Sequence, residues 1–143
     1  MSVSLYVFPA CGDESTPFDR TIVQQAFGSL IADPSDDHWE IVTLDGEFTG
    51  VGILIGLEPK ITGFSVDHPP GFKEFPEFWD ALIEVLQRTP AGMLWPCDAR
   101  SNYCVANAAA AAVIPADFVE SFGPPYVVSS VADIEAAMIE TNF

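Results

Sequence analysis

FPEFWDALIEVLQRTPAGMLWPC, residues 75–97, is the stretch that decides the fold. Its large apolar residues recur every three or four positions, which places them on one face of a helix. They are Phe75, Phe78, Trp79, Leu82, Ile83 and Leu86. Pro76 suits a first helical turn, where its missing N–H would be unpaired anyway. Pro90 and Gly92 end the helix, and residues 93–95 are too few for another one. The stretch therefore predicts an amphipathic helix followed by a buried strand.

Upstream of this unit, the sequence predicts an antiparallel meander of three strands. Residues 39–44 alternate apolar and polar side chains and are rich in β-branched residues, which is typical of a strand. Residues 45–47, Asp-Gly-Glu, have the composition of a hairpin turn. Residues 48–57 form the second predicted strand, and residues 60–66 form the third after a turn at Glu58 and Pro59. The meander supplies the antiparallel part of the expected sheet.

The N-terminal region predicts one strand and one helix. Residues 4–8 are rich in Val, Leu, Tyr and Phe and predict a buried first strand. Residues 10–17 form a loop, in which Thr16 is the expected N-cap of a helix with Pro17 in its first turn. The apolar stripe of that helix is Phe18, Ile22, Val23, Ala26, Phe27, Leu30 and Ile31.

The C-terminal region adds helices and a last strand. The alanine-rich residues 102–113 predict a helix, and residues 114–122 predict a short one after Pro115. Residues 126–128 predict the last strand, and Ser129 or Ser130 caps a terminal helix. The apolar face of that helix is Ile134, Ala137 and Met138. Strands that follow helices, residues 93–95 and 126–129, could add to either edge of the sheet.

The sum of these elements is a single α+β domain over residues 1–143. Its core is an antiparallel β-meander within a sheet of about five or six strands, and three or more helices pack on that sheet. A chain of 143 residues with 49% hydrophobic residues is large enough to bury a core without disulfides or a structural metal.

Charge is the most unusual property of the composition. The chain has 21 acidic and 5 basic residues, for a formal net charge of −16. Such a surface repels nucleic acid and anionic membranes, and it attracts basic proteins with fast, salt-sensitive association. The alternative interpretation is that acidity only keeps a small hydrophobic protein soluble.

The sequence predicts a cytoplasmic location. Its first residues lack the basic and apolar regions of a signal peptide. No window reaches the roughly 18 uninterrupted apolar residues that span a bilayer. The 3 cysteines, Cys11, Cys97 and Cys104, include no C-x-x-C pair. An odd count without such a pair argues for reduced thiols and against a disulfide framework or a zinc site.

Candidate catalytic, metal and phosphate sites are weak in this sequence. A nucleophile at Cys97 or Cys104 would need His38 or His68 brought close by the fold, and no local motif supports that arrangement. Asp36-Asp37-His38 and Asp67-His68 lack the spacing of a metal site, so no metal is expected. The glycines of residues 50–56 precede no helix, so they predict bends or bulges rather than a phosphate loop. No cofactor is expected.

An acidic segment remains as the candidate partner-binding site. Apart from His38, every ionisable side chain from residue 33 to residue 47 is acidic, and Trp39 lies among these acids. An aromatic anchor surrounded by acids predicts a docking face for a basic protein, because the anchor supplies contact area and the acids steer. The predicted contacts are Asp33, Asp36, Asp37, Trp39, Glu40, Asp45 and Glu47. The alternative is a solvated turn next to a core tryptophan. Residues 101–143 also lack Lys and Arg, so a second acidic face is an open alternative.

The whole-chain character, including the helix–strand unit VLQRTPAGMLWP at residues 85–96, resembles bacterial immunity proteins. These proteins neutralise cognate toxins of polymorphic toxin, contact-dependent inhibition and type VI secretion systems. The resemblance implies a non-enzymatic cytosolic α+β protein whose partner is a toxin. Two other classes stay open: a small-molecule enzyme with an unrecognised site, using Cys97 or Cys104, and an oligomeric accessory protein.

Overall fold

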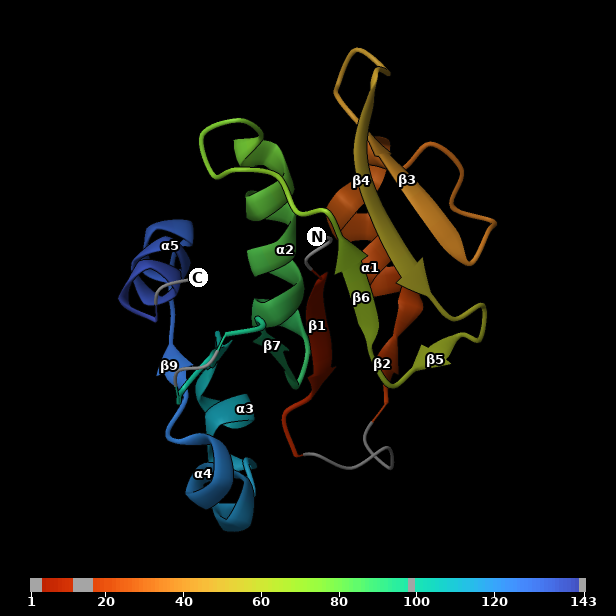
Figure 1. Cartoon of the computed structure of the whole chain (residues 1–143). Helices are drawn as coiled ribbons and strands as arrows, with labels where there is room; N and C mark the ends of the chain where they lie inside the picture. The colour runs from red at the N-terminus through yellow and green to blue at the C-terminus, as the bar shows by residue number, and fades with distance from the viewer. Residues whose placement is uncertain (1–3, 12–16, 98–99, 142–143) are drawn as a thin grey trace.

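The computed structural model describes residues 4–11, 17–97 and 100–141, which form an α+β arrangement (Figure 1). The strands are β1 (Ser4–Pro9), β2 (Phe18–Asp19), β3 (His38–Val42), β4 (Phe48–Ile55), β5 (Lys60–Ile61), β6 (Phe64–Asp67), β7 (Ala91–Leu94), β8 (Tyr103–Val105) and β9 (Tyr126–Val127). The helices are α1 (Arg20–Phe27), the 3₁₀ turn η1 (Gly28–Leu30), α2 (Pro76–Arg88), α3 (Ala108–Ala112), α4 (Ala116–Phe122) and α5 (Val131–Glu140).

The main sheet has seven strands in the order β3-β4-β6-β1-β7-β8-β9. Neighbouring strands are antiparallel, except that β8 and β9 are parallel. The predicted meander is confirmed, because β3, β4 and β6 are consecutive antiparallel neighbours. The α+β class and the packing of helices on a sheet are confirmed as well.

Helix α2 packs as its pattern predicted. Its apolar face is buried in one core with the inward side chains of the strands. Phe78 contacts Phe27 of α1 with ring centres 5.6 Å apart, and the ring of Phe72 stacks on Trp79 at 4.1 Å. Burying each large apolar side chain contributes roughly 1.5–3 kcal/mol, so this face is a main source of stability.

Helix α5 joins the same core from the other end of the sheet. Ser130 caps it by accepting a hydrogen bond from the Asp133 backbone N–H, and Ile134, Ala137 and Met138 are buried, as predicted. The buried indole N–H of Trp95 donates to the Thr141 hydroxyl at 2.8 Å. Within the described residues, no helix combines the length and apolar character needed to cross a bilayer.

The two faces of the sheet differ. Residues Trp39, Ile53 and Val66 point into the core, whereas their strand neighbours point to the opposite side. On that side a cross-strand row is formed by His38, Leu54, Ser65, Tyr6 and Leu94. Leu54 and Tyr6 are 53% and 50% exposed, so no described helix or strand covers this side over β3, β4, β6 and β1. We call it the open face.

Helix α4 covers the same side of the sheet as the open face, but only near β8. The ring of Phe118 stacks on Phe8 with centres 5.9 Å apart and meets Tyr103 edge-on at 5.0 Å. The Tyr103 hydroxyl donates to the carbonyl of Gly123 at 2.7 Å, which fixes the end of α4. The short helix predicted after Pro115 is therefore confirmed, and it marks the boundary of the open face.

The third predicted strand, residues 60–66, is wrong as one element. It divides into β5, which pairs with β2 in a separate small sheet, and β6 of the main sheet. Gly63 causes the division, because it has φ +150° and a Cβ there would lie 2.5 Å from the carbonyl oxygen of Val7. Only glycine lets the two backbones approach this closely.

The predicted helix over residues 102–113 is also wrong in its first half. Residues 103–105 form β8, and the helix starts only at Ala108, where the Asn107 side chain caps it. Tyr103, Cys104 and Val105 are fully buried between β7 and β9. Tyr103, Cys104 and Val105 are themselves poor helix formers, and their pairing with β7 and β9 makes them a strand, whereas the alanines from Ala108 onward form the helix.

Three placements also need correction. β7 lies inside the sheet between β1 and β8 rather than at an edge, although β9 is an edge strand. β1 is not buried throughout, because Tyr6 faces the open side. Helix α1 begins at Arg20, since Phe18 belongs to β2; the predicted cap Thr16 lies outside the described residues.

Candidate functional site

Residues 33–37, which we call the acidic turn, are held in place by Arg20. Its Nη2 donates to the carbonyls of Pro34 and Asp36, both at 2.9 Å, and its Nε donates to the carbonyl of Gly56 at 2.8 Å. The carbonyl of Asp37 accepts from the backbone N–H of Ile55. The arginine therefore binds main-chain oxygens and leaves the carboxylates of the turn to face solvent.

Hydrogen bonds inside the turn orient two of its carboxylates. Asp33 accepts from the backbone N–H and the hydroxyl of Ser35, at 3.0 and 2.7 Å, and these bonds lower the pKa of Asp33. Asp36 accepts from the backbone N–H of Asp37 at 2.7 Å, and hydrogen bonds to Asp37 likewise lower the pKa of Asp36. Both groups are thus charged and pre-oriented at neutral pH.

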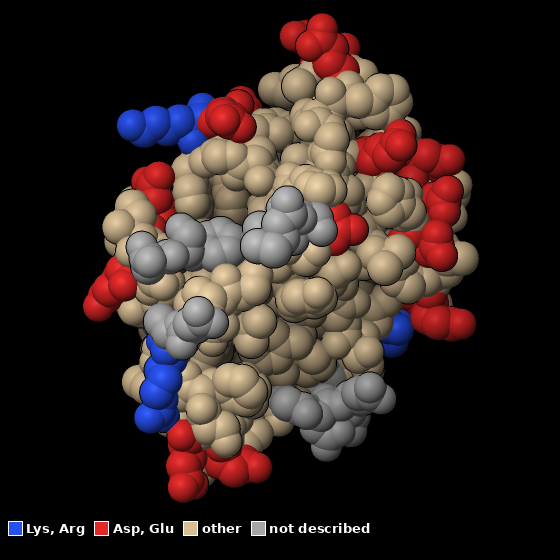
Figure 2. Space-filling view, in the orientation of Figure 1, with Lys and Arg blue, Asp and Glu red and all other residues tan. Residues whose placement is uncertain are grey.

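Few basic groups offset the acids. Among the described residues, the ion pairs are Lys60 with Asp19 and Arg88 with Glu84. Arg100, like Arg20, donates to backbone carbonyls. Figure 2 shows acidic side chains gathered along the side of the molecule where β3 and the preceding turn lie. The negative field of this side is therefore largely uncompensated.

Trp39 cannot act as the predicted surface anchor. Its side chain is fully buried on the core side of β3, and its indole N–H donates to the carbonyl of Pro34 at 3.2 Å. The guanidinium of Arg20 lies 5.0 Å from the centre of its ring. Trp39 is the core tryptophan of the alternative interpretation, and it supports the acidic turn from beneath. Its strand neighbour Glu40 is exposed on the open face.

A bulge in β4 shapes the open face beside the turn. The register with β3 shifts between the pair Glu40–Gly52 and the pair Val42–Phe48. Gly50 has φ +83°, a conformation that side-chain-bearing residues rarely adopt, and the Thr49 hydroxyl donates to the carbonyl of Ile41 at 2.7 Å. The predicted bulge or bend at these glycines is confirmed. Bulges of this kind often re-aim side chains near functional sites.

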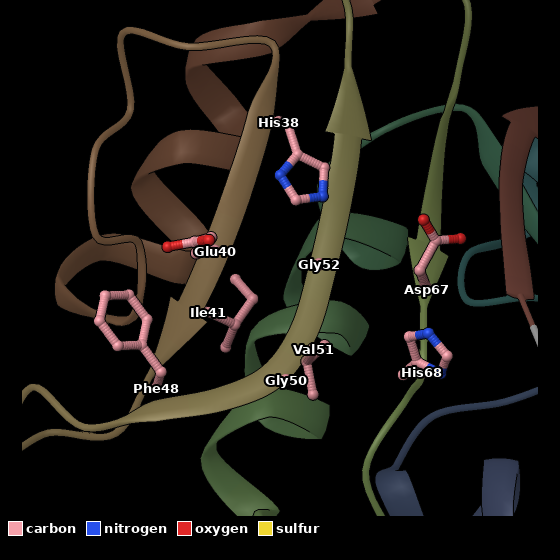
Figure 3. A pocket seen from close by; sticks show the side chains of 9 residues that line it. All are labelled: His38, Glu40, Ile41, Phe48, Gly50, Val51, Gly52, Asp67 and His68. Carbon is pink, nitrogen blue, oxygen red and sulfur yellow. The ribbon is translucent and has the colours of Figure 1, made fainter. Parts of the chain in front are cut away.

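The bulge forms the floor of a hollow of about 320 Å³, which we call the β4 hollow. Its lining includes Gly50, Gly52, His38, Glu40, Phe48, Asp67 and His68. Figure 3 shows Glu40 and Phe48 on one side of β4, Asp67 and His68 on the other side, and the His38 ring over β4. A Cβ on Gly52 would lie 2.8 Å from His38 Nε2, so the glycine makes room for this ring.

Two details fix the far wall of the hollow. The Ser4 hydroxyl donates to Asp67 Oδ1 at 2.7 Å, which orients that carboxylate. His68 follows β6 with φ +54°, an uncommon conformation for a residue with a side chain. Backbone strain of this kind concentrates at functional sites.

The other predicted contacts fall in neighbouring hollows. Asp33 and Asp36 line a hollow of about 240 Å³ together with His38 and Glu40, which also line the β4 hollow, so the acidic turn adjoins the β4 hollow. Asp45 lines a third hollow of about 390 Å³ with Glu74 and Glu77, at the other end of the β3–β4 hairpin. Glu47 is exposed in that hairpin turn. The hollows described here have no lysine or arginine in their lining.

The cysteines give little support to a thiol enzyme. Cys104 is fully buried in β8, and burial raises its pKa from 9.0 to about 12. A thiol with this pKa stays protonated and is a poor nucleophile at neutral pH. Cys97 is half-buried and packs against the core. Among the described residues, no group of three or more His, Cys, Asp or Glu side chains could hold a metal ion.

Comparison of the chain with protein-family models, curated proteins and solved structures finds no match. The site therefore rests on its own geometry. Sequence reasoning missed the β4 hollow, because it treated Asp67, His68 and Phe48 as turn and strand residues. The signal was the pair Gly50 and Gly52, since glycines inside a strand mark a bulge or a close approach.

Proposed function

We propose that this protein is a non-enzymatic acidic binding protein, an immunity protein that neutralises a cognate bacterial toxin by covering its active site or basic surface. The observation that carries the proposal is the acidic turn held by Arg20 and joined to an uncovered, acid-lined sheet face. The toxin as partner comes from the resemblance to immunity proteins and is the finer part of the proposal.

The geometry suits binding of a basic protein for two reasons. The turn is already ordered, so its acids bind without a large loss of conformational entropy on association. The uncompensated charge accelerates encounter with a basic surface and lowers affinity for acidic competitors.

Contact area comes from the open face rather than from Trp39. Tyr6, Phe48 and Leu54 are 50%, 70% and 53% exposed on β1 and β4. Exposed aromatic and aliphatic groups close to the acids supply surface that loses water in a complex. A partner that covers these groups and the acidic turn together would have its basic cleft blocked.

Salt-dependent binding tests the proposal. The tagged protein is used to isolate partners from the native cytoplasm, and the association rate of a purified partner is then measured at low and high salt. The test variant carries Asp33→Asn, Asp36→Asn and Asp37→Asn, which remove charge but keep the oxygen acceptors of the turn. The control carries Asp80→Asn, Asp117→Asn and Glu120→Gln, which remove the same charge from α2 and α4.

The expected result is a basic partner at near-stoichiometric yield whose association slows at least tenfold in the turn variant at low salt and changes little in the control. Equal rates for both variants would show that another face binds. A partner whose association does not respond to salt would contradict the electrostatic part of the proposal.

A further inference from the structure

We propose that the β4 hollow receives the guanidinium group of an arginine side chain from the basic partner. This inference rests on the proposed function, because the partner supplies the arginine. The inference adds two details to the proposed function. It names the type of partner residue that inserts, arginine, and the place on the open face where this residue binds, the β4 hollow.

The first argument is charge placed on two sides of a small space. Glu40 and Asp67 stand on opposite sides of Gly52, since both pair with it across neighbouring strands. In the part of the chain that the structure describes, no lysine or arginine lines the hollow. Ser4 holds one oxygen of Asp67, so this carboxylate is positioned before a ligand arrives. A guanidinium has N–H groups on several sides and can bond two carboxylates at once.

The second argument is shape. The floor of the hollow is the bulged backbone at Gly50 and Gly52, and rings of Phe48, His38 and His68 stand around it (Figure 3). A guanidinium is flat, stacks on rings and is weakly hydrated, whereas the ammonium of lysine is a compact, strongly hydrated charge. The hollow of about 320 Å³ is at the small end of ligand sites, which suits one side chain.

The third argument concerns Gly50 and Gly52, which stand in β4 where residues with side chains are more usual. Gly50 occupies a left-handed conformation, and any side chain at Gly52 would displace His38. A side chain at Gly52 would enter the space between Glu40 and Asp67, where the His38 ring lies close to the strand. Gly52 thus keeps this space free of a side chain of its own, and an inserted guanidinium would meet the His38 ring there.

Nuclear magnetic resonance with small probes tests the hollow without the partner. N-acetyl-arginine amide and N-acetyl-lysine amide are titrated into the whole protein, and the amide resonances of Gly50 and Gly52 are followed. We expect saturable shifts with the arginine probe and at least tenfold weaker binding of the lysine probe. Equal binding of the two probes, or no binding of the arginine probe, overturns the inference.

Matched variants locate the binding. Gly52→Ala and the double variant Glu40→Gln with Asp67→Asn should each weaken the arginine probe at least tenfold. Gly56→Ala and Glu58→Gln are the controls, because a Cβ on Gly56 meets only an ordinary contact at 3.8 Å and Glu58 is exposed outside the hollow. Phe48→Ala changes a side chain that is 70% exposed, so this variant should fold, and its affinity for the arginine probe replaces that of Gly52→Ala if Gly52→Ala fails to fold. Probe binding that survives the double variant and Phe48→Ala overturns the inference.

Partner binding separates this inference from the proposed function. A captured basic partner whose affinity is unchanged by the Glu40→Gln, Asp67→Asn double variant overturns the inference and leaves the function standing. Probe binding without any basic partner contradicts the proposed function, and with it the partner as the source of the arginine. At least a tenfold loss of partner affinity in the double variant, with parental affinity in the control Glu58→Gln, supports both.

Discussion

The guanidinium of Arg20 lies 5.0 Å from the centre of the Trp39 ring while it donates to the carbonyls of Pro34 and Asp36. One cation on α1 therefore connects a buried aromatic ring of β3 with the main chain of the acidic turn. Arginine can do both, because its planar group stacks on a ring face and carries several donors in fixed directions. Through Arg20, the acidic turn is therefore anchored to the buried core of the protein.

Arg20→Lys is expected to lower the free energy of unfolding by about 1–3 kcal/mol, because lysine cannot keep three donor contacts and the ring contact together. Urea unfolding followed by tryptophan fluorescence measures the change. Lys73→Ala, at an exposed position, is the control and should stay within about 0.5 kcal/mol of the parent. If Arg20→Lys matched the control, the turn would be held by other contacts.

Gly63→Ala is expected to destabilise the protein by about 3 kcal/mol or more, because the new Cβ would meet the carbonyl oxygen of Val7 at 2.5 Å and β6 would have to leave β1. Thermal unfolding checks the loss. Gly56→Ala introduces the same methyl group without such a contact, so it should change little. Similar melting temperatures for the two variants would disprove the close approach.

Asn107→Asp is expected to lower the free energy of unfolding by about 2 kcal/mol. The Asn107 amide donates to the carbonyls of Leu86 and Thr89 at 3.1 and 3.0 Å, and a carboxylate there would instead face oxygens at the C-terminal end of α2. Denaturant unfolding at pH 7 gives the value. The control Gln87→Glu places the same charge on an exposed neighbour. An equally large loss of unfolding free energy in Gln87→Glu would show that the added charge, rather than the lost hydrogen-bond donors, causes the effect.

Cys104 is expected to resist thiol reagents in the folded protein. Burial raises its pKa to about 12, so the folded state keeps the proton more tightly than the unfolded state, whose thiol has a pKa near 9.0. The resulting stability is present in full below pH 9 and is lost as the pH rises toward 12. Reaction with a chromogenic disulfide at pH 8, with and without urea, measures access. Fast modification of Cys104 without urea would refute its burial.

Asp133→Asn is expected to lower stability at pH 7 and to have no effect in acid. Hydrogen bonds from the Ser129 backbone N–H and hydroxyl hold the pKa of Asp133 below its ordinary 3.8. A depressed pKa contributes stability above 3.8 that disappears as the pH falls through the folded value. Urea midpoints of both proteins at pH 7 and pH 2.5 test this, with Asp80→Asn as the control. A difference that persisted at pH 2.5 would assign the effect to shape rather than charge.

Local patterns predicted the parts of the fold whose information lies within a few neighbouring residues. Helix α2, the hairpin at Gly46 and the Ser130 cap depend on periodicity, turn chemistry and one side-chain bond, all readable from adjacent positions. The acidity of residues 33–47 is likewise read directly from the sequence. Local patterns failed where distant strands competed for a segment, as at residues 103–105 and at Gly63.

By itself, then, the sequence determined the α+β class, the meander and the acidic turn, because helical periodicity, strand alternation and charge are properties of neighbouring residues. Tertiary structure alone decided that β7 lies inside the sheet, that Trp39 points into the core and that Asp67 faces Glu40 across Gly52. Those relationships depend on which strands pair and in which register. A shift of one residue in register moves each side chain to the other face, and the register is set by two paired strands together rather than by one segment alone.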